Sequence, residues 1–180
     1  MKGLYVNTKK IKRMIELKTT SWAHVGLTNC YAFALGLDVC YFNISKNAYA
    51  PGSFFERRYK TSIKGLSFEE KLIRDLDALE IDYQETDPFT KIDPNNKDKV
   101  EYLITLLEGH GDFHFLRKDN VNHTWYHKRG WVEYPKNTDD QGLIIINPKS
   151  AIISDYQVVK TYQLSFERKR GGHRGIWICY

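Results

Sequence analysis

Residues 112–131 read DFHFLRKDNVNHTWYHKRGW, and this stretch predicts a β-hairpin. Its two arms, residues 112–118 and 124–131, alternate between apolar and polar side chains, as strands with one buried face do. The residues between the arms, Asp119–Asn122, are types that favour a tight turn. The second half of the chain therefore favours pleated sheet, in keeping with its many aromatic residues.

Two histidines lie at matching places in the two arms. We expect the turn to be centred at residues 120–121, so that His114 lies directly opposite His127. The same pairing places Leu116 opposite Trp125. Directly opposed residues share one face of a sheet, with Cβ atoms about 5 Å apart, so the two imidazoles are expected to touch. Such a pair suits a base held by an orienting neighbour; two half-exposed strand histidines are the alternative, and a one-residue slip would separate them.

Residues 28–37, TNCYAFALGL, predict a short helix with a cysteine in its first turn. Thr28 or Asn29 can cap its start, and Gly36 lies where a helix often ends. Unpaired backbone N–H groups and the helix dipole favour the thiolate form of a cysteine at this place. Cys30 is therefore predicted to be a nucleophile, with a small buried hydrophobic residue as the alternative.

The rest of the chain predicts one more helix and several strands. The helix covers Phe68–Glu80, with Ser67 and Glu70 forming a capping box and Asp75 expected on the solvated face. Pro51–Gly52 predicts a turn. The predicted strands are residues 99–107, 143–146, 158–166 and 175–179. For residues 99–107 a helix is the alternative, and their alternating pattern and β-branched residues favour a strand. Helices followed by an antiparallel sheet indicate an α+β fold in which the helices pack on one face of the sheet.

The composition fits one globular domain. The chain has 180 residues, of which 42% are apolar, so it can bury a sizeable core without a metal or disulfide. Its three cysteines are irregularly spaced, which argues against a disulfide framework. We expect a basic extension over residues 1–20 and a single domain over residues 21–180. We expect no cofactor and no metal, although zinc bound by Cys30 and the two histidines is an alternative.

The formal net charge of +5 is a mild bias and does not identify a partner. Basic clusters at residues 9–13 and 168–170 could contact an anionic surface. No base-stacking module accompanies them, so we do not expect nucleic acid as a partner. The start of the chain lacks an apolar signal core, and no apolar run is long enough to span a membrane. We therefore expect a protein that is cytoplasmic as synthesised; the sequence does not predict its oligomeric state.

Several blocks of the sequence are similar to a set of bacterial proteins of the papain-like superfamily, in its NlpC/P60-like branch. Residues 29–35 (NCYAFAL), followed by Pro51–Gly52, resemble an NCYAYAL…PG pattern of these proteins. Residues 112–117 (DFHFLR) and 125–128 (WYHK) resemble their DYHWYR…WSHK blocks. The similarity extends in scattered blocks over residues 22–150. It implies a papain-like core, with the cysteine on an early helix and the histidines on later strands.

The resemblance also implies a role for each residue of the site. Cys30 would be the nucleophile, His114 the general base and acid, and His127 the orienting residue. Asn29 could support the oxyanion, although a helix cap is its simpler role. The sequence departs from the pattern at Tyr126, which replaces a serine, and at residues 129–131.

The implied activity is that of a cysteine peptidase or amidase: a thiol hydrolase or acyltransferase that acts on an amide bond in a peptide or a peptidoglycan stem. The expected partner is a peptide-like substrate. Because no export signal is present, action outside the cell would require a non-classical route, as for a toxin, an effector or a phage-borne enzyme. The alternative is a non-catalytic binding protein on the same fold.

Overall fold

The computed structural model of the chain describes residues 29–36, 50–93, 96, 98–130 and 133–167. Several predictions concern other residues and lie outside these ranges: the extension 1–20, both basic clusters, the strand 175–179, Cys40 and Cys179.

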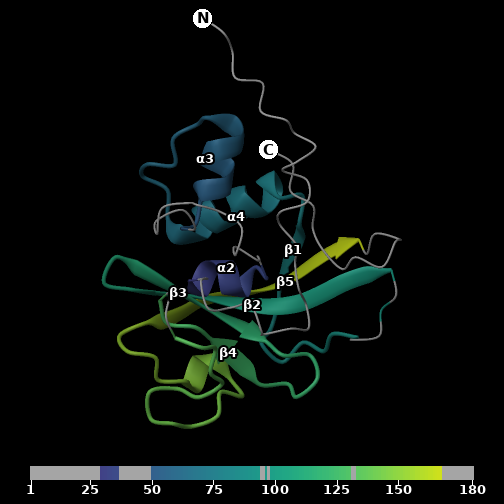
Figure 1. The fold of residues 1–180 in the computed structure, drawn as a ribbon, viewed down its shortest axis with the longest axis vertical. Coiled ribbons are helices and arrows are strands. Elements are labelled where there is room, and N and C mark those ends of the chain that lie inside the picture. The colour runs from purple at the N-terminus through teal and green to yellow at the C-terminus, as the bar shows by residue number, and fades with distance from the viewer. Residues whose placement is uncertain (1–28, 37–49, 94–95, 97, 131–132, 168–180) are drawn as a thin grey trace, which may run out of the picture.

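The three α-helices come first in the described chain and the five strands follow them (Figure 1). The helices are α2 (Cys30–Ala34), α3 (Ser53–Tyr59) and α4 (Phe68–Ala78). The strands are β1 (Asp82–Glu85), β2 (Lys99–Gly109), β3 (Asp112–Lys118), β4 (Trp125–His127) and β5 (Gln157–Glu167), and a 3-10 turn, η2 (Pro148–Ser150), precedes β5.

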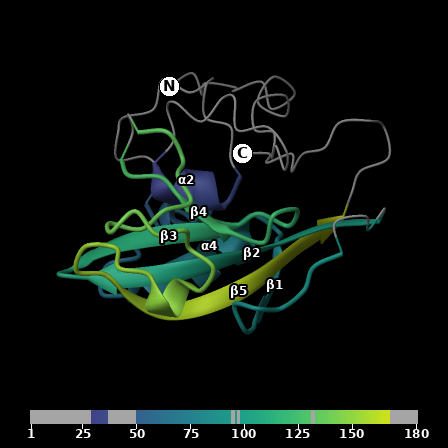
Figure 2. The same cartoon turned by 90° about the horizontal axis from the view of Figure 1, so that it is seen from below.

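The five strands form one antiparallel sheet in the order β1-β5-β2-β3-β4. Figure 1 shows α3 and α4 together on one side of the strands and the loops that follow β4 on the other. Figure 2 shows α2 beside the β3 and β4 end of the sheet, where it packs against both strands. The α+β class predicted from the sequence is confirmed.

Apolar residues are buried on both faces of the sheet, because side chains alternate along β2 and β3. On the helical face, Leu76 of α4 and Tyr31 of α2 share a cluster with Leu106 and Phe115. On the opposite face, a second cluster contains the following residues of strands and loops: Leu103, Leu107, Leu116, Trp125, Ile145 and Ile153. The two clusters fix the sheet between the helices and the long loop that leads from β4 to β5.

The predicted helix caps are confirmed. Asn29 caps α2, and its side-chain oxygen accepts a hydrogen bond from the backbone N–H of Ala32 at 2.9 Å. The chain leaves this helix through Gly36, which has a φ of 68° that glycine adopts without strain. At the start of α4, Ser67 and Glu70 form the capping box.

The turn at Pro51–Gly52 is confirmed, and it leads into α3, which the sequence did not predict. Gly52 has a φ of 92°, and a Cβ atom there would lie 2.5 Å from Cδ1 of Ile63. Only glycine therefore fits this turn.

The short edge strand β1 was also not predicted; all four of its residues are exposed, so it carries no alternating pattern.

Asp75 is fully buried, so its expected place on the solvated face of α4 is wrong. Its carboxylate accepts hydrogen bonds from the Tyr31 hydroxyl, from the backbone N–H of Gly52 and from that of Phe55, each at 2.7 Å. Burial raises the pKa of Asp75 to about 6, and the three donors act against that rise. The carboxylate joins α4 to α2 and to the start of α3.

Two predicted strands differ from the structure. The second arm of the hairpin pairs only over Trp125–His127 rather than over residues 124–131. Residues 143–146 are not a buried strand: Ile145 is buried, but Leu143, Ile144 and Ile146 are exposed. In this segment Ile144 makes only an isolated bridge, to Thr138. An apolar run can thus lie in an extended loop that buries one side chain.

None of the described helices is long and apolar enough to cross a bilayer.

Replacing Asp75 with Ala should leave two backbone N–H groups and the Tyr31 hydroxyl without an acceptor in the core. We expect a loss of at least about 3 kcal/mol in the free energy of unfolding, since each buried unpaired group costs roughly 1–3 kcal/mol. Asp77→Ala, at an exposed position of the same helix, is the matched control and should change stability by less than about 0.5 kcal/mol. Urea denaturation measures both, and equal losses would contradict the role of Asp75.

Candidate active site

The register of β3 and β4 differs by two residues from the predicted one. Leu116 lies opposite His127, so neither its predicted pairing with Trp125 nor the direct opposition of His114 and His127 is correct. The reason is the loop Asp119–Thr124, closed by a 2.8 Å hydrogen bond from the N–H of Asp119 to the carbonyl of Thr124. A shift of two residues keeps every side chain on its face. The two histidines are therefore diagonal neighbours on one face.

The histidine rings touch, as the sequence predicted. Nε2 of His114 lies 2.9 Å from Nδ1 of His127, and the ring planes are nearly perpendicular at 86°. Nε2 of His127 lies 3.0 Å from the carbonyl oxygen of Thr138. A carbonyl only accepts, so this Nε2 carries a proton and Nδ1 of neutral His127 carries a lone pair. His114 then donates from Nε2 and keeps its own lone pair on Nδ1, which has no hydrogen-bond partner among the described residues.

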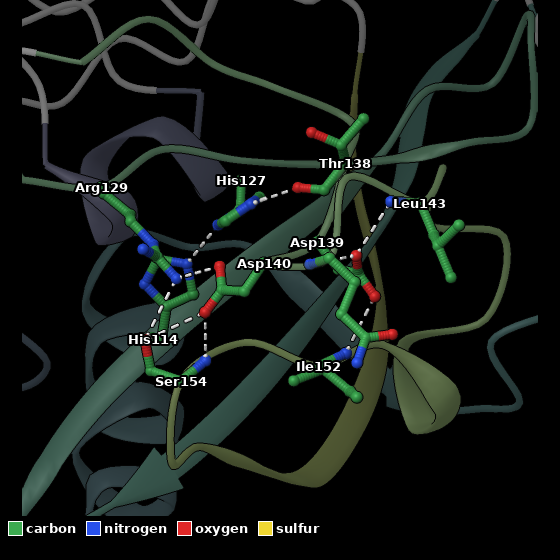
Figure 3. Close-up of polar contacts among 10 residues, drawn as sticks. His114, His127, Arg129, Thr138, Asp139, Asp140, Leu143, Ile152 and Ser154 are labelled. Carbon is green, nitrogen blue, oxygen red and sulfur yellow. Dashed lines mark hydrogen bonds and ion pairs between the residues drawn. The ribbon is translucent and has the colours of Figure 1, made fainter.

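The Thr138 carbonyl is held in place by a tight loop that the next residue organises (Figure 3). The buried Asp139 carboxylate accepts hydrogen bonds from the backbone N–H groups of Gln141 at 2.9 Å and Leu143 at 3.0 Å. It also accepts one from the N–H of Ile152 at 3.2 Å. Burial raises the pKa of Asp139, but the three donors outweigh it and the net shift is downward. The loop is therefore a fixed support for His127.

A second polar cluster lies against the histidines. The Arg129 guanidinium pairs with the Asp140 carboxylate and donates to the Ser154 hydroxyl at 3.1 Å. The same carboxylate accepts the N–H of Ser154 at 2.6 Å. Figure 3 shows the guanidinium beside the ring of His114. Arg129 thus connects the end of β4 to the loop that contains Asp140 and to the loop that contains Ser154.

The surroundings keep both histidines neutral. Burial, the ring of His127 and the nearby Arg129 lower the pKa of His114 to about 3. Burial also lowers the pKa of His127, against the opposing effect of its hydrogen bond to Thr138. At neutral pH His114 is therefore uncharged and keeps a lone pair on Nδ1, and its pKa of about 3 makes this nitrogen a weak base in the resting protein.

Cys30 is the first residue of α2 and is 8% exposed. The pairing of β4 with β3 ends at Leu116, so the preceding residues of β3 present an open backbone edge on the side of β4. The backbone N–H of Phe115 donates to the Cys30 sulfur at this edge. Phe115 follows His114 directly, so Cys30 lies against the β3 backbone next to the predicted base. The His114 side chain projects from the other face of β3, where its ring contacts His127 and Tyr156. Asn29, the predicted support for the oxyanion, uses its side chain to cap the same helix.

The expectation that the helix start favours the thiolate is wrong for the resting protein. Burial raises the pKa of the Cys30 thiol to about 12. The N–H groups of Phe115, Tyr31 and Cys30 itself act in the opposite direction, but they do not offset burial, and the carboxylate of Asp112 adds to the rise. The thiol and the imidazole are thus both uncharged at rest.

Sequence reasoning missed two further side chains near Cys30 and His114, Tyr156 and Lys128. The Tyr156 hydroxyl donates to Asp112 at 2.7 Å, and its ring centroid lies 5.5 Å from that of His114. Lys128 is fully buried, and its ammonium donates to the carbonyl of Gly130 at 2.7 Å. Tyr156 comes from a loop without a periodic pattern, so only the tertiary structure reveals it. Lys128 follows the last residue of β4 directly, and the sequence gives no signal that a lysine at this place is buried.

Within the described ranges, no group of three or more His, Cys, Asp or Glu side chains is arranged to hold a metal ion.

The raised pKa of Cys30 makes its alkylation depend on pH in a definite way. We expect the rate of reaction with iodoacetamide to rise by about tenfold per pH unit from neutral to strongly alkaline pH, because the reactive thiolate is a small fraction throughout. Mass spectrometry of the Cys30 peptide measures this rate. A rate that is already constant around neutral pH would instead show a preformed thiolate–imidazolium pair.

Comparison of the chain with models of protein families, with curated protein sequences and with solved structures finds no match. The geometry of the site is therefore the basis for a functional proposal.

Proposed function

We propose that this protein is a cysteine hydrolase or acyltransferase that acts on an amide bond of a peptide-like substrate, on a papain-like core. The observation that carries the proposal is the hydrogen bond from His114 Nε2 to His127 Nδ1. Together with the Thr138 carbonyl, it assigns the tautomer of His114 and leaves Nδ1 as a proton acceptor. A nucleophile, a base and a group that orients the base are the parts that acyl transfer requires.

In the first step, His114 Nδ1 accepts the thiol proton while the Cys30 sulfur attacks the carbonyl carbon. The electron pair of the C=O bond moves to oxygen, and the oxyanion needs hydrogen-bond donors. The N–H groups of Cys30 and Tyr31 at the start of α2 are suited to this role, since both favour negative charge on the neighbouring sulfur by lowering its pKa. His114 then returns the proton to the leaving amine as the C–N bond breaks, and an acyl-enzyme remains.

In the second step, His114 removes a proton from water as the water attacks the thioester. The C–S bond then breaks, the acid is released, and His114 returns the proton to the Cys30 sulfur. An amine in place of water gives acyl transfer. The positive charge that His114 gains in each step lies beside the lone pair on His127 Nδ1, and the proton on His127 Nε2 is donated to the carbonyl of Thr138. Because the resting pair is neutral, proton transfer accompanies attack and does not precede it.

One observation favours a second candidate, a non-catalytic protein that binds a ligand at the same place. Burial raises the pKa of the Cys30 thiol to about 12, which suits a structural cysteine. Acylation of Cys30 by a small activated ester distinguishes the two candidates, because a binding protein has no reason to accelerate it.

We therefore expect 4-nitrophenyl acetate to acetylate Cys30, seen as a mass increase on its peptide, and Cys30→Ala to abolish this. His114→Ala should slow acetylation by at least about a hundredfold, the usual contribution of a general base. His127→Ala should slow it by roughly tenfold to a hundredfold, typical when the partner of a histidine is removed. His127→Asn should restore part of the rate, since its side-chain oxygen can accept from Nε2 of His114.

Circular dichroism and thermal melting serve as the control that each variant is folded. Acetylation of folded His114→Ala at the wild-type rate would contradict the proposal and favour the binding protein.

A further inference from the structure

Arg129 is the one side chain in the described site that presents unused hydrogen-bond donors beside the proposed base. Its contacts with Asp140 and Ser154 both use a single nitrogen, NH2. The other guanidinium nitrogens have no hydrogen-bond partner among the described residues, and the side chain is 35% exposed. A guanidinium has five N–H donors, so a planar acceptor can still bind.

The position of Arg129 directs these donors to the site. The guanidinium lies beside the imidazole of His114 (Figure 3) and close enough for its charge to act on that ring. The Asp140 carboxylate and the Ser154 hydroxyl hold it there, so little side-chain freedom is lost when a ligand binds. A preorganised arginine of this kind binds carboxylates in a bidentate way.

The other charged groups around the histidines are consistent with an anionic ligand. Lys136 also acts on both rings as a positive charge. Two carboxylates face the site, but each has a partner: Asp140 is paired with Arg129, and Asp112 accepts the hydroxyl of Tyr156. Because Asp140 offsets the charge of Arg129, Lys136 supplies the net positive charge that acts on the two rings.

We propose that Arg129 binds a carboxylate of the substrate, so that the protein acts on acidic peptide-like amides with a free carboxylate close to the scissile bond. This inference rests on the proposed function. It assigns to Arg129 the role of a specificity residue, while Cys30 and His114 carry out the bond-making steps.

The test compares two alkylating probes that differ only in charge, N-iodoacetylglycine and the neutral N-iodoacetylglycinamide. With either probe, the Cys30 sulfur forms a bond to the CH2 carbon and iodide leaves with the electrons of the C–I bond. The rates at Cys30 are measured by mass spectrometry on the full chain at about pH 9, where the thiolate fraction is about a hundredfold larger than at pH 7. The rate ratio of acidic to neutral probe is compared with that of the denatured chain, which removes the intrinsic difference between the probes.

We expect the folded protein to favour the acidic probe and Arg129→Met to lower the rate ratio by about fivefold to tenfold, the effect of one charge-assisted hydrogen bond. Arg129→Lys keeps the charge but loses the planar fork, and should give an intermediate ratio. Arg74→Met, which removes the same charge from the exposed surface of α4, is the matched control and should leave the ratio unchanged.

A ratio that is the same in the wild type and in folded Arg129→Met overturns the inference and leaves the proposed function intact. A separate outcome tests the proposed nucleophile rather than the role of Arg129. If neither probe modifies Cys30 in the folded protein while both modify it in the denatured chain, the proposed nucleophile is wrong, and the inference fails with it.

Discussion

The buried carboxylate of Asp75 is the contact on which the arrangement of the helices depends. Helix α2 has five residues and α3 has seven, too few for either to be stable alone. Asp75 extends from the longer α4 and accepts the hydroxyl of Tyr31 in α2 and two N–H groups at the start of α3. The ring of Tyr31 in turn packs 5.0 Å from that of Phe115 on β3. The start of α2, and with it Cys30, is thereby fixed against the sheet.

The early end of β4 leaves the backbone of β3 open beside Cys30. His114 projects from the face of β3 opposite Phe115, so a helix packed on the Phe115 face would not reach it through a complete sheet. Because β4 pairs only as far as Leu116, the edge of β3 is open at these residues. The Cys30 sulfur occupies that edge and uses the N–H of Phe115 that a longer β4 could have taken. The short strand is thus a requirement of the site.

The sequence predicted the parts that local patterns determine. The caps at Asn29 and Ser67 and the face shared by the two histidines follow from side-chain type and from the two-residue period of a strand. The exact register did not follow, because residues 119–124 offer several polar turn positions that preserve the same face. The burial of Asp75 and the support of His127 by Thr138 depend on contacts between distant segments, which no local pattern records. The prediction that Cys30 favours the thiolate form was wrong for the same reason, because the burial that raises its pKa is a tertiary property.

The central claim is that Cys30, His114 and His127 act as one unit, in which His127 works only through His114. A double-mutant cycle on the rate of Cys30 acetylation tests this most directly, with His114→Ala, His127→Ala and the double variant compared with the wild type. If His127 acts through His114, its removal should have no further effect once His114 is absent, so the double variant should react at the rate of His114→Ala alone. Losses that multiply in the double variant would show that the two histidines act independently, and would contradict the account.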